Sequence, residues 1–145
     1  MADNSPLILA VADLAYSGGE SAELLTLILR RYLQIDLQIV PLAEVATTVK
    51  RSKPDLLIIG HRPLVEDKPM RERWKMAGSP MGGDIVRALK SDPESKDVPI
   101  LMVEALIDLE KLAGECGADC YVTVPFGPQE LVAAIKPWIA ADKQT

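Results

Sequence analysis

Short apolar runs alternate with helical patterns along the whole chain. The runs are rich in aliphatic residues and are apolar at successive positions, as is typical of strands that are buried on both faces of a sheet. We predict strands over Leu7–Ala12, Leu37–Val40, Leu56–Ile59, Pro99–Val103 and Cys120–Val124.

The segments between these runs repeat their apolar residues at helical spacing. In the first of them, apolar residues at positions 24, 25, 28, 29 and 33 fall on one face of a helix. Pro128 suits the first turn of the last helix, and Pro137 predicts a kink or an end before Trp138. The predicted helices are Glu20–Leu33, Leu42–Lys50, one beginning near Gly83, Asp108–Cys116, and one beginning at Pro128.

Strands that alternate with helices predict an α/β fold, a doubly wound five-stranded parallel sheet with helices on both faces. The length of 145 residues fits a single domain over residues 1–145. In such folds ligands bind at the carboxyl ends of the strands. The residues to consider there are Asp13, Gly60, His61, Glu104 and Val124.

The charge and the composition narrow the function. A net charge of −5 and the lack of a clustered basic patch argue against direct binding to nucleic acid or to an anionic membrane. We find no secretory leader and no apolar stretch of membrane-spanning length. Cys116 and Cys120 fit a reducing compartment, so we expect a cytoplasmic protein.

Three stretches carry a resemblance to a known family. They are PDLLII followed by HRP, then MGGDIVRALKSDPESKDVPILMVEA, and CGADCYVTVPFGPQEL. In order and spacing they resemble the response-regulator receiver domains over nearly the full chain. The resemblance implies the flavodoxin-like receiver fold and a phosphoryl transfer to an aspartate after the third strand, assisted by Mg²⁺.

The residues of that phosphoryl site are largely replaced in this sequence. By the resemblance, the phosphoacceptor position falls on Gly60, and the acidic pair falls on Ala12 and Asp13. The position of the hydroxyl residue is Glu104, and that of the lysine is Val124. Only Asp13 keeps the family's residue, so we expect an atypical pseudo-receiver that is not phosphorylated, is not an enzyme and needs no cofactor.

His61 raises an alternative function. His61 could itself accept a phosphoryl group, and together with Asp13 and Glu104 it has the donor atoms of a small metal site. A separate alternative is a small-molecule sensor or enzyme in the cleft at the strand ends, in which Asp13 and Glu104 form a carboxylate pair. A single histidine without a spaced set of ligands favours the plainer interpretation, a loop residue and no metal. Cys116 and Cys120 are likewise better explained as two semi-buried thiols than as a redox pair.

A long segment at about 64–80 departs from ordinary receivers, in which a few residues make this connection. Its length suggests a binding element, and Trp74 within it is a candidate anchor for a partner.

We expect the chain to act by binding another protein. In the family, the docking surface is formed by the fourth helix, the fifth strand and the fifth helix. This surface corresponds to residues 106–116, 121–124 and 128–138. The candidate contacts on it are Leu109, Leu112, Tyr121 and Trp138, and an exposed Trp138 beside Ile139 would also suit a homodimer.

Overall fold

The computed structural model describes residues 6–11, 22–41, 44–60, 82–104, 109–123 and 128–143. They form five strands and five helices that alternate along the chain. The strands are β1 (Leu7–Val11), β2 (Asp36–Val40), β3 (Leu56–Ile59), β4 (Ile100–Glu104) and β5 (Cys120–Thr123). The helices are α1 (Ala22–Tyr32), α2 (Val45–Ser52), α4 (Gly82–Ser91), α5 (Leu109–Cys116) and α6 (Pro128–Lys143).

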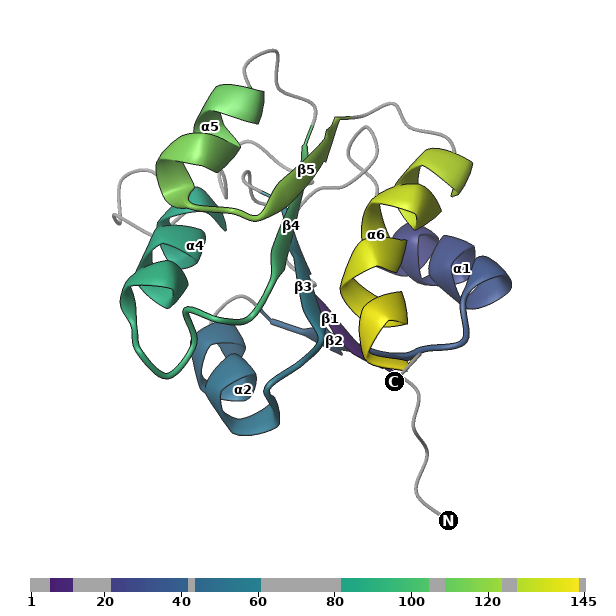
Figure 1. Cartoon of the computed structure of the whole chain (residues 1–145), viewed down its shortest axis with the longest axis horizontal. Helices are drawn as coiled ribbons and strands as arrows, with labels where there is room; N and C mark the ends of the chain where they lie inside the picture. The colour runs from purple at the N-terminus through teal and green to yellow at the C-terminus, as the bar shows by residue number, and fades with distance from the viewer. Residues whose placement is uncertain are drawn as a thin grey trace, which may run out of the picture.

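The strands form one parallel sheet in the order β2-β1-β3-β4-β5. Helices α1 and α6 cover one face of the sheet, and α2, α4 and α5 cover the other (Figure 1). This is the predicted doubly wound α/β fold. Each predicted strand is present, and its bounds agree to within one or two residues.

The core is aliphatic because the central strands are covered on both faces. Every residue of β3 is fully buried, and so are Ile8 to Val11 in β1 and Ile100 to Val103 in β4. Leu29 of α1 and Leu131 and Ile135 of α6 close one side of this core. Burial on both faces is the reason that these strands read as continuous apolar runs.

Of the two outcomes predicted for Pro137, a kink or an end of the helix, the structure excludes the end. Helix α6 does not end before Trp138 but continues through Pro137 to Lys143. A proline within a helix removes one backbone hydrogen bond and crowds the preceding turn. Here Ile135 and Ile139, which lie on either side of Pro137, are both buried in the core. Their burial stabilises the turns around the proline and offsets that cost.

Candidate functional site

The carboxyl ends of β1, β3, β4 and β5 lie along one edge of the sheet, at Val11, Ile59, Glu104 and Thr123. The strand order changes direction between β1 and β3, because β2 lies on one side of β1 and β3 on the other. Ligand sites of parallel sheets lie at such a switch point. Two of the predicted site residues, Gly60 directly after β3 and Glu104 at the end of β4, therefore lie at the end of the sheet where this fold accommodates a ligand.

Gly60 follows β3 directly at this edge, and it is buried. Ile59 pairs with Met102, so the continued register brings Gly60 level with Val103 and one residue before Glu104. Glycine offers only backbone atoms here. The position directly after β3 therefore presents no side chain at this end of the sheet.

Other predicted site residues are only partly described. Glu104 ends β4 and pairs in register with Thr123, which agrees with its predicted place at the carboxyl edge. Leu109 and Leu112 belong to α5, and Tyr121 lies in β5 with 41% of its surface exposed. The remaining predictions, which concern Asp13, His61, Val124, Trp74 and the segment at about 64–80, lie outside the described residues.

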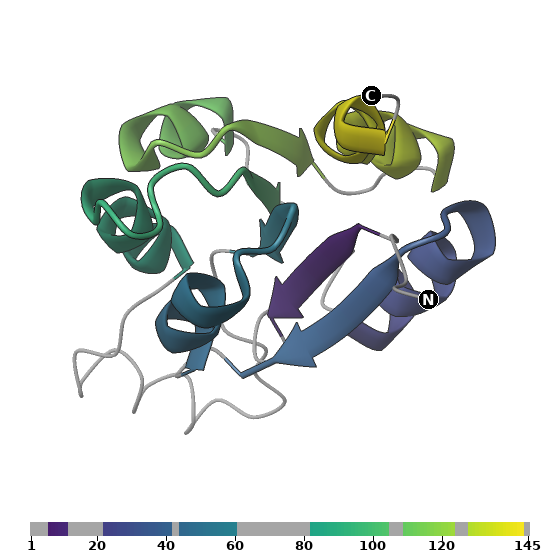
Figure 2. The same cartoon turned by 60° about the horizontal axis from the view of Figure 1, so that its bottom comes forward.

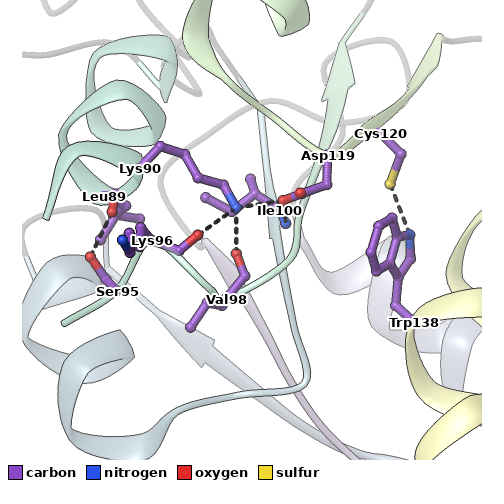
Figure 3. Close-up of polar contacts among 9 residues, drawn as sticks. All are labelled: Leu89, Lys90, Ser95, Lys96, Val98, Ile100, Asp119, Cys120 and Trp138. Carbon is purple, nitrogen blue, oxygen red and sulfur yellow. Dashed lines mark hydrogen bonds and ion pairs between the residues drawn. The ribbon is translucent and has the colours of Figure 1, made fainter. Parts of the chain in front are cut away.

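Trp138 corrects the predicted patch for self-association. Its ring is half-buried against the core, and its indole N–H donates a hydrogen bond of 3.1 Å to the Cys120 Sγ atom (Figure 3). Ile139 beside it is buried. The two side chains therefore form part of the packing of α6 on the sheet and do not present an exposed apolar surface.

Two described carboxylates bind strand backbone at the opposite end of the sheet, where the strands begin. Asp55 stands directly before β3, and its Oδ2 atom accepts the Leu7 N–H at 2.8 Å. Asp119 stands directly before β5, and its Oδ2 atom accepts the Ile100 N–H at 2.8 Å. Both carboxylates bind backbone N–H groups where strands begin, at the end of the sheet opposite Gly60 and Glu104.

Lys90 joins α4 to this amino edge (Figure 3). Its Nζ atom lies 2.6 Å from Asp119 Oδ2 and donates to the carbonyls of Lys96 and Val98 at 3.1 and 2.9 Å. In the same turn, the buried Ser95 hydroxyl donates to the Leu89 carbonyl at 2.8 Å. The sequence interpretation missed this network. The sequence feature that could have indicated it is Asp119, an aspartate immediately before the apolar run of β5.

Helix α2 also contacts the turn between α4 and β4. Lys50 forms an ion pair with Asp92, and the Lys53 Nζ atom donates to the Glu94 carbonyl at 2.8 Å. The hydrogen bond between Lys50 and Asp92 raises the pKa of the lysine and lowers that of the carboxyl group. These contacts link α2 to the turn between α4 and β4, at the end of the sheet where the strands begin. They lie away from the carboxyl ends of the strands.

Both cysteines are free thiols, with Cys116 buried and Cys120 half-buried, as predicted. Burial raises the pKa of Cys116, and it raises the pKa of Cys120 to about 11 even though the Trp138 N–H favours the thiolate. A thiol with a raised pKa is a poor nucleophile and a poor metal ligand at neutral pH. Among the residues that the structure describes, no three histidine, cysteine, aspartate or glutamate side chains group as metal ligands.

Within the described part of the chain, no helix is both long enough and apolar enough to cross a membrane.

Comparison with known proteins relates the sequence to response regulators, although no protein-family model matches it. The phosphate regulon transcriptional regulatory protein PhoB of Pseudomonas aeruginosa is 40% identical over 86 residues, which are 58% of this chain and 31% of that protein. The DNA-binding response regulator MtrA of Mycolicibacterium smegmatis is 32% identical over 117 residues, which are 79% of this chain and 44% of that protein. The chain thus spans less than half the length of these relatives.

Solved structures match over nearly the whole chain. A putative response regulator from Chloroflexus aurantiacus has a TM-score of 0.73 and 25% identity, with 94% of this chain and 99% of that chain covered. The signal receiver domain of a histidine kinase from Syntrophus aciditrophicus has a TM-score of 0.70 and 24% identity, with 97% and 95% covered. The chemotaxis response regulator CheY4 of Vibrio cholerae, at 16% identity and a TM-score of 0.68, shares the fold.

The strand order, the position of the switch point and these similarities agree with the resemblance found in the sequence. The chain belongs to the response-regulator receiver-domain family, whose members are signalling modules of two-component systems.

Proposed function

We propose that this receiver domain transmits its signal by binding a protein partner and without phosphorylation of an aspartate. The observation that carries the proposal is Gly60, a buried residue without a side chain at the carboxyl end of β3. Aspartyl phosphorylation needs a carboxylate at the end of this strand, and it needs Mg²⁺ to offset the charge of the phosphoryl oxygens.

The neighbouring positions support the same conclusion. Ala12 removes one carboxylate from the expected metal-binding pair, and Val124 removes the expected cation. Glu104 ends the adjacent strand β4, where a carboxylate would repel a phosphoryl group. We therefore propose that no step of covalent catalysis takes place in the pocket and that the domain is not an enzyme.

A surface around β5 is our candidate for the contact with the partner. Tyr121 is the one residue of β5 with a large exposed aromatic side chain, and it lies at the edge of the sheet between α5 and α6. Tyrosine is enriched in protein interfaces because it combines a large apolar ring with a polar end. Two free thiols support a reducing, cytoplasmic location.

Capture of partners from a cell extract tests this proposal. The chain serves as bait with and without acetyl phosphate and Mg²⁺, and Tyr121→Ala serves as a matched bait. We expect one set of partners to bind equally well under both conditions and to be lost with the variant. Capture that requires the phosphodonor contradicts phosphorylation independence, and equal capture by both baits contradicts the assigned surface.

The alternative function is a small-molecule or metal sensor, or an enzyme, at the same edge. It depends on Asp13 and His61 and on the side chain of Glu104, which the structure does not describe. It remains a prediction. Calorimetric titration with Zn²⁺ and Mn²⁺ distinguishes the two, because a stoichiometric heat that disappears in His61→Ala would favour the sensor.

A further inference from the structure

The outer edge of β2 is open within the described part of the chain. Strand β2 lies last in the sheet and pairs only with β1 among the described strands (Figure 2). An unpaired strand edge presents backbone donors and acceptors to any further strand that approaches it. The question is which strand would fit.

The backbone of β2 defines which groups are available. The Asp36 N–H donates to the Pro6 carbonyl at 2.8 Å, so the backbone groups of Asp36 point toward β1. Successive residues of a strand direct these groups to opposite sides, which points those of Leu37 and Ile39 toward the open edge. The Arg30 guanidinium, which approaches the Leu37 carbonyl at 3.5 Å, agrees with that direction.

This arrangement is self-complementary. An antiparallel copy of β2 centred on Gln38 would pair Leu37 with Ile39 of the second copy, and Ile39 with its Leu37. Each pair exchanges two hydrogen bonds, which uses every outward backbone group of these residues. We propose that two copies of this domain associate through their β2 edges, with a two-fold axis at Gln38.

Most of the exposed large apolar side chains belong to the two elements at this side of the sheet. Among the described residues, four large apolar side chains are exposed, and three of them belong to α1 and β2: Leu27 (69%), Tyr32 (49%) and Ile39 (43%). Exposed apolar groups that cluster on one region are typical of an interaction surface. The fourth, Tyr121, lies on the opposite edge strand.

The sequence of α1 provides charge complementarity for the same two-fold axis. Helix α1 packs beside β2, so the axis brings α1 of both copies to the same face of the joined sheet, running antiparallel. Glu23, Leu27 and Arg31 occupy successive turns of this helix. In a dimer in which the two helices cross at Leu27, Glu23 of one copy lies at the level of Arg31 in the other copy.

Arg30 sets a limit on this association. A charged side chain over a strand edge is a common protection against pairing. Its contact with the Leu37 carbonyl is at the long limit of hydrogen bonding, so it is weak and can be released. We therefore expect a reversible dimer, and Arg30→Ala should strengthen it.

A cysteine placed on the axis tests the register. Gln38 is exposed, and opposed residues at a non-hydrogen-bonded antiparallel position have Cα atoms about 4.5 Å apart, within the range of a disulfide. Gln38→Cys should form a reducible dimer under mild oxidation with diamide. The exposed Asp36→Cys should not, because in this register the two Asp36 residues lie about 13 Å apart. Unmodified protein, which retains Cys120, serves as the control.

Sedimentation equilibrium tests the same surface without cross-linking. We expect the unmodified chain to show a dimer that Arg31→Glu abolishes and that the double variant Glu23→Arg/Arg31→Glu restores. Ile39→Pro should also abolish it while leaving the pairing with β1 intact, since it removes only an outward N–H. Tyr121→Lys on the other edge should have no effect.

A monomer at all concentrations, equal cross-linking of both cysteine variants, or a dimer unaffected by these changes would overturn the inference. None of these outcomes bears on Gly60, so the inference can fail independently of the proposed function.

Discussion

Asp119 and Ile100 bind each other through two hydrogen bonds at the start of strands β4 and β5. The Ile100 N–H donates to Asp119 Oδ2 at 2.8 Å, and the Asp119 N–H donates to the Ile100 carbonyl at 2.9 Å. Asp55 and Leu7 repeat this arrangement at the start of β1 and β3, with both distances at 2.8 Å. Two aspartates thus fix the register of two strand pairs at the end of the sheet where the strands begin, opposite Gly60 and Glu104.

Removing one of these carboxylates should destabilise the domain. We expect Asp119→Ala to lower the free energy of unfolding by about 1.5–3 kcal/mol, because it breaks charge-assisted hydrogen bonds that are partly shielded from water. The measurement is urea denaturation followed by circular dichroism. The exposed Asp97→Ala should change stability by less than about 0.5 kcal/mol. Equal losses in the two variants would show that Asp119 has no special structural role.

Lys90, the ion-pair partner of Asp119, should also contribute to the stability of the domain. Its Nζ atom contacts one carboxylate and two carbonyls, and only 16% of the side chain is exposed. Lys90→Met keeps the aliphatic stem and removes the donors, so we expect a loss of about 1–3 kcal/mol in denaturant unfolding. The exposed Lys96→Met provides the control. If both variants unfold at the same urea concentration, the contribution assigned to Lys90 is refuted.

Replacement by alanine should change the stability of the domain in opposite directions at Gly114, within α5, and at Gly117, directly after it. Gly117 has φ of +90° where α5 ends, so Gly117→Ala should cost about 1 kcal/mol or more. Gly114 lies within the helix, and open space surrounds the position that an added Cβ atom would take, so Gly114→Ala should stabilise by up to about 1 kcal/mol. Thermal unfolding of both variants decides this. A stabilising Gly117→Ala would be inconsistent with the left-handed end of α5.

The Cys120 thiol should make the folding stability of the protein depend on pH in the alkaline range. Its pKa is about 11 in the folded state, raised by burial from the value of about 8.5 expected for an exposed thiol. The unfolded chain therefore loses this proton first, and stability should fall as the pH rises from about 8.5 to about 11. Below that window the thiol is protonated in both states and contributes no pH dependence.

The rate of alkylation by iodoacetamide, followed at Cys120 by peptide mass mapping, measures that pKa. The midpoint of the rate profile should lie near 11 in the native protein and near about 8.5 in denaturant. Trp138→Phe removes the N–H donor, so the native midpoint should move higher. A native midpoint equal to that in denaturant would mean that burial in the folded protein does not raise the pKa of the Cys120 thiol.

The sheet and the helices could be predicted from the sequence because burial on both faces leaves an unbroken apolar run at each strand. The same local signal does not reveal long-range contacts. Trp138 was expected on the surface, but it is half-buried because α6 packs against β5 at Cys120, eighteen positions earlier in the chain. A local pattern does not show that contact. Asp55 and Asp119 were missed because an aspartate before a strand resembles an ordinary turn residue until its hydrogen-bond partner is known.

The candidate site was predictable in position but only partly in content. Gly60 and Glu104 lie at the expected carboxyl ends of β3 and β4, which follow from the parallel topology. Which side chains meet there depends on the segments that follow β1, β3 and β5. The apolar pattern of a strand does not predict the conformation of the segment after it.

The most direct test of the central claim is the intact mass of the unmodified chain after incubation with acetyl phosphate and Mg²⁺. The control is a variant that restores the four replaced positions, as Ala12→Asp, Gly60→Asp, Glu104→Thr and Val124→Lys. An added phosphoryl mass on this variant shows that the reagents are active. We predict no added mass on the unmodified chain. A stoichiometric phosphoryl adduct on it would contradict the claim that this receiver works without aspartyl phosphorylation.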